Sequence, residues 1–159
     1  MNKNSKGFTL IELLVVIGIL AVLLAITLIA INPQRQFSQA NNTKRSSDVN
    51  AILNAINQSM ADNKGIAPAG IDGTIKTLTN DAAVIAAGTG VDICSVLVTQ
   101  YLAALPVDPQ TNNGTPVTDC TIVAPPYNTN YTVVRSGTDN RITVAAPGSE
   151  LSAAISVTR

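Results

Sequence analysis

The stretch Phe8-Thr-Leu-Ile-Glu12-Leu-Leu-Val-Val-Ile17 opens a segment that carries no charged side chain from position 13 to position 31. As an α-helix, residues 13–31 would span about 28 Å, close to the roughly 30 Å hydrocarbon core of a bilayer. The seven residues that begin the chain are polar and include Lys3 and Lys6. The pattern predicts a membrane-inserted helix behind a short cationic leader.

Two ordinary explanations of such a span leave Glu12 unexplained. A conventional secretory signal has an apolar core of about 7–15 residues followed by a small-x-small cleavage site, whereas this core is longer and no clean site follows it. An uncleaved membrane anchor fits the length. A carboxylate costs on the order of 2.5–3.5 kcal/mol near mid-membrane and less at the edge, so Glu12 needs a counter-charge. A cut after Gly7 would supply one, the new α-amine of Phe8.

This combination resembles the processing signature of type IV prepilins and pseudopilins. A basic leader, Gly7-Phe8, Thr-Leu and Glu12 stand together directly before the charge-free span. The resemblance implies that a prepilin peptidase cuts after Gly7 and methylates the amine of Phe8. It also implies that Glu12 meets the amine of a neighbouring subunit as a filament grows. Farther along, the stretch Tyr101-Leu-Ala-Ala-Leu-Pro-Val-Asp-Pro109 is similar to a phrase common in pilin and pseudopilin heads.

The resemblance implies a structural subunit of a type IV pilus, which would be a single-pass membrane precursor and then part of a cell-surface filament for adhesion or motility. Its partners would be further copies of itself, prepilin peptidase, the pilus assembly machinery and, before assembly, the membrane. Two alternatives stay open: a pseudopilin of a type II secretion or DNA-uptake filament, and a membrane-tethered binding domain that never polymerises.

Composition argues against other classes of function. The formal net charge is zero and there is no His, so we expect no nucleic-acid partner. No Ser or Cys is flanked by a recognisable base, and we therefore expect neither enzyme activity nor a cofactor.

The rest of the chain divides into segments. We expect a leader at residues 1–7, a membrane and filament-core helix at 8–33, an amphipathic helix at 34–64 and a globular head at 65–159. Asn32-Pro33 predicts a break, because Pro33 lacks a backbone donor and disfavours helical geometry at the residue before it. One apolar stripe at helical spacing consists of Val49, Ile52, Leu53, Ile56 and Met60. Lys64-Gly65 predicts the end of the second helix.

Short apolar runs punctuated by Gly, Pro, Thr, Asn and Asp predict a β-rich head. We expect a short helix at residues 96–105, a hairpin of residues 131–135 and 141–145, and a further strand at 153–157. The predicted fold class is α+β, with the amphipathic half of the long helix packed on a small antiparallel sheet.

The head also contains two candidate sites. Cys94 and Cys120 follow the apolar segment, which implies export to an oxidising compartment, and we expect them to form a disulfide that contributes about 3.5 kcal/mol. A zinc site is a poor alternative, because two cysteines without a His cannot complete its ligands. Asp108, Asn112, Asn113 and Asp119 are weak calcium candidates, since their spacing does not match an EF-hand and polar residues are usual in turns.

Overall fold

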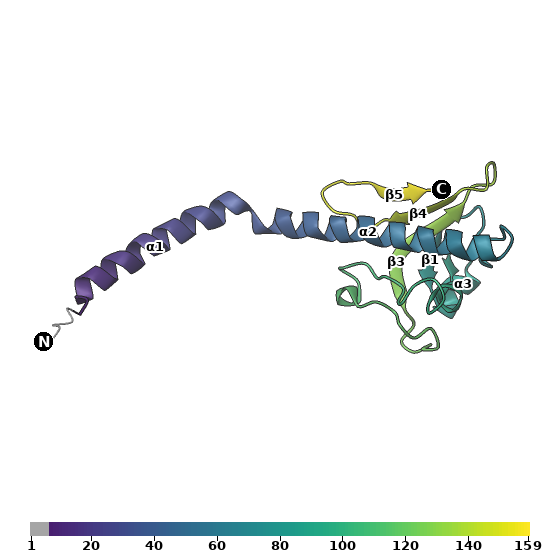
Figure 1. Cartoon of the computed structure of the whole chain (residues 1–159), viewed down its shortest axis with the longest axis horizontal. Helices are drawn as coiled ribbons and strands as arrows, with labels where there is room; N and C mark the ends of the chain where they lie inside the picture. The colour runs from purple at the N-terminus through teal and green to yellow at the C-terminus, as the bar shows by residue number, and fades with distance from the viewer. Residues whose placement is uncertain (1–6) are drawn as a thin grey trace, which may run out of the picture. The chain divides into compact units, whose positions relative to one another are not determined.

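The computed structural model describes residues 7–159 (Figure 1). The chain forms two units, one ending at Phe37 and the other comprising Ser38–Arg159, the head. The predicted leader, apart from Gly7, lies outside the described residues. As predicted, the fold is α+β: a long apolar N-terminal helix is followed by a small five-stranded sheet.

The N-terminal helix α1 spans Leu10–Ile31. Among residues 7–159 it is the one helix long and apolar enough to cross a membrane. It ends at Asn32, whose φ of 40° and ψ of 79° lie in the left-handed region. Helix α2 begins at the next residue, Pro33, whose missing N–H costs nothing at the first position of a helix. The predicted interruption at Asn32-Pro33 is therefore confirmed.

Helix α2 spans Pro33–Asp62, and within the head it lies along one face of the sheet (Figure 1). The predicted apolar stripe is confirmed, with four members fully buried in the core and the last one partly buried: Val49, Ile52, Leu53, Ile56 and Met60. The chain turns away after the helix at Gly65, which has a φ of 84° and donates its N–H to the Met60 carbonyl at 2.7 Å.

The head places its strands in the order β2-β1-β3-β4-β5. The elements that follow α2 are β1 (Lys76–Thr79), α3 (Ala82–Ala86), β2 (Gly90–Val91), α4 (Cys94–Leu97), the 3₁₀ turn η1 (Asn112–Gly114), β3 (Asn128–Arg135), β4 (Ile142–Ala146) and β5 (Ile155–Thr158). The predicted hairpin is confirmed, because β3 and β4 pair antiparallel with Val133 opposite Val144. The predicted last strand is confirmed as β5, which pairs antiparallel with β4.

The sheet is mixed, so the expectation of a purely antiparallel sheet was wrong at one edge. Strands β1 and β2 run parallel, with Leu78 opposite Val91. Helix α3 makes the crossover that a parallel pair requires. A side chain at Gly90 would meet Thr79 and Val84 at 2.9 Å, so this edge strand passes too close to its neighbours for any larger residue.

The predicted helix at residues 96–105 was also wrong. Helix α4 covers only Cys94–Leu97, after which Val98 is extended and Thr99 has a φ of 73°. Farther on, Leu105 exchanges two backbone hydrogen bonds with Val117 at 2.8 and 2.9 Å. The apolar residues of this segment thus reach the core from irregular backbone, which periodicity alone does not distinguish from a buried helix.

Candidate functional site

The start of α1 is organised by a reciprocal pair of hydrogen bonds between Thr9 and Glu12. Thr9 is the N-cap, and its hydroxyl Oγ1 accepts from the Glu12 N–H at 3.3 Å. In return, Glu12 Oε2 accepts from the Thr9 N–H at 2.8 Å and from Thr9 Oγ1 at 2.6 Å. This capping box satisfies two backbone donors that the first turn leaves free, and it fixes the Glu12 carboxylate at the positive end of the helix.

The residues that flank the expected cut, Gly7 and Phe8, are exposed in the part of the chain that the structure describes. In the uncut chain Phe8 is joined to Gly7, and its side chain is 90% exposed. A Cβ added to Gly7 would meet nothing within 4 Å. A requirement for glycine at this position would therefore come from the molecule that acts on the junction rather than from the fold of this chain.

Helix α1 is exposed on every face within its own unit, as far as residues 7–37 describe it. Its large apolar side chains are between 50% and 84% exposed, and none of its residues is buried. The exposed surface surrounds the whole helix, whereas a helix that packs on a soluble core has one apolar stripe. A helix that is apolar all round is stable only when lipid or other protein covers it.

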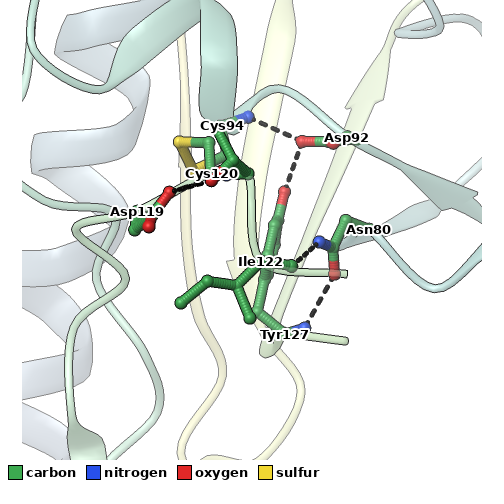
Figure 2. Close-up of a disulfide and its surroundings, with 8 residues drawn as sticks. Asn80, Asp92, Cys94, Asp119, Cys120, Ile122 and Tyr127 are labelled. Carbon is green, nitrogen blue, oxygen red and sulfur yellow. Dashed lines mark hydrogen bonds between the residues drawn. A yellow bond between two sulfur atoms is a disulfide. The ribbon is translucent and has the colours of Figure 1, made fainter. Parts of the chain in front are cut away.

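The structure joins Cys94 to Cys120 by a disulfide, with the Cα atoms 5.5 Å apart. The surrounding loops are held by Tyr127 (Figure 2). Asp92 Oδ1 accepts from the Tyr127 hydroxyl at 2.6 Å and from the Cys94 N–H at 2.9 Å. Asn80 accepts from the Tyr127 N–H at 2.7 Å and donates to the carbonyl of Ile122 at 2.7 Å. Burial, and then the adjacent Asp92 carboxylate, raise the pKa of Tyr127, so this hydroxyl remains a donor.

The calcium candidates have separate roles in the structure. Asp108 is fully buried, and its two carboxylate oxygens accept from Arg45 Nε at 2.7 Å and Nη2 at 3.0 Å. Asp119 accepts from the N–H and the hydroxyl of Thr121. Asn112 begins the short turn η1 and lies with Asp119 along a cleft of about 430 Å³ that Asp108 does not line. The Arg45 guanidinium therefore already binds both oxygens of the Asp108 carboxylate, which separates it from the other calcium candidates.

Arg45 of α2 is fully buried, although charged side chains of an amphipathic helix ordinarily face solvent. Its side chain is 0% exposed, and Nη1 donates to Asn42 Oδ1 at 3.0 Å and to Glu150 Oε2 at 2.9 Å. Together with the contacts to Asp108, these bonds use all three guanidinium nitrogens, Nε, Nη1 and Nη2. The hydrogen bonds from Arg45 to Asp108, and the charge of Asp108, raise the pKa of Arg45. The cluster joins α2 to the loops that contain Asp108 and Glu150, both distant in sequence. No local sequence motif predicts these contacts. Thr9 was also missed, although the spacing Thr-x-x-Glu is the sequence signal of a capping box.

Comparison with known proteins identifies the N-terminal segment. Residues 2–28 match the family described as the prokaryotic N-terminal methylation motif, the leader signature of type IV prepilins. No curated protein and no solved structure matches the chain. The motif supports a pilin-like or pseudopilin-like subunit and implies processing by prepilin peptidase and an assembly machinery. Together with the apolar helix α1, it fits a membrane-anchored precursor.

Proposed function

We propose that this chain is the structural subunit of a type IV pilus, anchored in the membrane by α1 before assembly and polymerised through the same helix. In the assembled state it is part of a cell-surface filament that serves adhesion or motility. The observation that carries the proposal is a helix that is apolar on every side and begins with one carboxylate, within a prepilin signature. The proposal gives the chain no catalytic role and no cofactor.

The apolar surface of α1 supports polymerisation through this helix. Fully burying one Leu or Ile side chain is worth about 1.5–3 kcal/mol relative to water, so α1 cannot leave the bilayer unless something else covers it. Neighbouring copies of α1 supply an equally apolar surrounding. Gly18 has no atom within 4 Å of the place where a Cβ would stand, which leaves room for a second helix. Such small residues also occur in helices that do not associate.

Glu12 supports a directional contact between copies. Cleavage after Gly7 would convert the amide nitrogen of Phe8 into a charged amine, one turn away from the carboxylate that Thr9 already holds. In an apolar surrounding, the two charges gain by pairing, because each is costly when unpaired. The amine of an incoming subunit that paired with Glu12 of its neighbour would set the axial register. Apolar packing alone does not do this.

The proposal is tested by comparing membrane level and filament yield. Filaments sheared from cells should contain this chain as their main band, and its N-terminal peptide should begin at Phe8 and carry one methyl group. Glu12→Gln should leave the membrane level unchanged and sharply reduce the yield in sheared filaments. Asp139→Asn, which alters an exposed carboxylate in the β3–β4 turn, is the matched control and should keep normal yield.

An intact Met1 in the mature protein, or a cut beyond Ile31, would contradict the processing step. Normal filament yield from Glu12→Gln would refute the register mechanism even if cleavage occurs as expected. A membrane protein that is cut and methylated but never recovered in filaments would favour the tethered binding domain. Recovery only in short periplasmic filaments would favour the pseudopilin.

A further inference from the structure

The loop between β4 and β5, residues 147–154, holds the first head residues of α2 through Glu150. Its carboxylate accepts from Ser38 Oγ at 2.8 Å, from Asn41 Nδ2 at 3.0 Å and from Arg45 Nη1 at 2.9 Å. Its backbone completes the contact, because the carbonyl accepts from Asn42 Nδ2 at 2.7 Å and the N–H donates to Asn42 Oδ1 at 2.9 Å. One residue thus ties four positions of the helix to the loop.

This attachment is polar throughout. Before the apolar stripe begins at Val49, the buried residues of α2 are Ser38 and Arg45. Leu151, the large apolar residue of the loop, is 52% exposed. Hydrogen bonds to water compete with every bond in such a contact, and local stability is low where few apolar groups are buried. The loop is therefore held less firmly than the core beneath residues 49–56.

The backbone of the loop is strained. Leu151 has a φ of 58° and Ser152 has a φ of 56°, and both side chains carry the Cβ that disfavours this region. Two consecutive residues of this kind persist only when surrounding contacts impose the conformation. The contacts that do so here include the hydrogen bonds of Glu150 to α2 and two bonds within the loop, from the Ala153 N–H to the Glu150 carbonyl at 3.1 Å and from Ser149 Oγ to the Ala153 carbonyl. Breaking those bonds would let the loop relax.

The pair of Arg45 with Asp108 is a second attachment of a different kind. Both side chains are 0% exposed, and the two hydrogen bonds at 2.7 and 3.0 Å leave from Nε and Nη2, not from the Nη1 that Glu150 uses. The Glu150 side chain can therefore leave without breaking the bonds of the inner pair, which Gly148 of the same loop continues to cover: a Cβ added there would meet Asp108 Oδ2 at 3.0 Å. The side chain of Glu150 is 24% exposed, so water already reaches the outer contact.

We propose that the Glu150 loop is a releasable clasp. Residues 150–152 open from residues 38–42 of α2, while Gly148, the Arg45–Asp108 pair and the apolar core stay in place. When the clasp is closed, the part of α2 that is fixed to the head begins at Ser38. When it is open, this part begins at Arg45, and the helix gains roughly 10 Å of unattached length at 1.5 Å per residue. The inference is independent of polymerisation.

Thiol labelling of the full chain in detergent, with the native disulfide intact, measures the opening. A cysteine at Ser38, which is 7% exposed, reports the clasp, and one at Ser59, which is 1% exposed, reports unfolding of the core. A cysteine at the exposed Ser46 gives the labelling rate of an unprotected thiol. We expect Ser38→Cys to react at least about tenfold faster than Ser59→Cys, because local opening requires less free energy than global unfolding.

Adding Glu150→Ala should raise the rate at Ser38→Cys by about tenfold or more and leave the rate at Ser59→Cys unchanged. Asp139→Ala is the matched control, because this carboxylate bonds only within its own turn, and it should change neither rate. Equal labelling rates at the two reporters would overturn the proposal, since loop and core would then open together. So would a Glu150→Ala effect that is absent or the same at both reporters.

Discussion

Replacing Asp108 by alanine removes the carboxylate that compensates a fully buried guanidinium. Loss of one partner of a buried ion pair costs about 3–5 kcal/mol, because the remaining charge is left uncompensated. Arg45 would keep its bonds from Nη1 to Asn42 and Glu150, so we expect a loss near the lower end, about 3 kcal/mol. For a domain of this size that loss lowers the melting temperature by about 10 °C.

The double variant Arg45→Met with Asp108→Leu distinguishes an uncompensated charge from lost packing. Replacing both partners of a buried ion pair by apolar residues of similar volume is often neutral or stabilising. We therefore expect the double variant to lie within about 1 kcal/mol of the parent. Asp139→Ala, at a side chain that is 52% exposed, is the surface control and should stay within about 0.5 kcal/mol.

Thermal and urea denaturation of the full chain in detergent, followed by circular dichroism, measures these differences. A melting temperature of Asp108→Ala within a few degrees of the parent would contradict this prediction, because the carboxylate would then not compensate the charge of Arg45. A double variant as unstable as the single variant would show that packing around the pair, not the uncompensated charge, accounts for the loss.

Further predictions concern the disulfide, the clasp and the helix cap. Replacing Cys94 and Cys120 together by Ser should lower the free energy of unfolding by about 3 kcal/mol while leader cleavage, followed by mass spectrometry, continues. Hydrogen bonds from Asn41, Arg45 and Ser38 hold the pKa of Glu150 below its usual value, so its contribution to stability is complete above that value and is lost as pH falls through the folded-state pKa. Glu150→Gln should therefore be less stable than the parent at pH 7, and denaturation midpoints should converge as the solution is acidified below about pH 4. Thr9→Val should destabilise the first turn of α1 by about 1 kcal/mol, seen as faster amide exchange at Glu12 in micelles, and unchanged exchange there would refute the capping role.

Helices and strands whose apolar residues repeat at a regular spacing were predictable from the sequence. The stripe on α2 repeats at helical spacing, and the β3–β4 hairpin alternates on both sides of a Gly-containing turn, so local patterns determine both. The break before Pro33 follows from the chemistry of one residue. The N-terminal signature was equally recognisable from the sequence, because its residues are contiguous.

The features that escaped prediction depend on partners far along the chain. In the sequence, Arg45 resembles a solvent-facing cation on a helix. Its partners Asp108 and Glu150 are far along the chain, and no sequence spacing predicts their contacts with Arg45. The parallel pairing of β2 depends on the close passage of Gly90. Residues 98–105 contain enough apolar side chains for a helix, but their backbone forms turns instead, with bonds from Tyr101 and Leu102 to the Leu97 carbonyl, and Leu105 pairs with Val117.

The disulfide determines which pieces of the head stay joined after a protease cuts the backbone. Cys94 and Cys120 close a covalent ring, so a single backbone cut anywhere in residues 95–119 leaves both pieces attached to one another. Asp108 lies inside that ring and would stay tethered beside Arg45 after such a cut. A cut in the turn at residues 137–140 has no such protection, because β4, β5 and Glu150 would then be held by non-covalent contacts alone: the pairing with β3, the buried side chains of β4 and the hydrogen bonds of Glu150 to α2. The chain thus tolerates a nick on one side of the head and is vulnerable on the other.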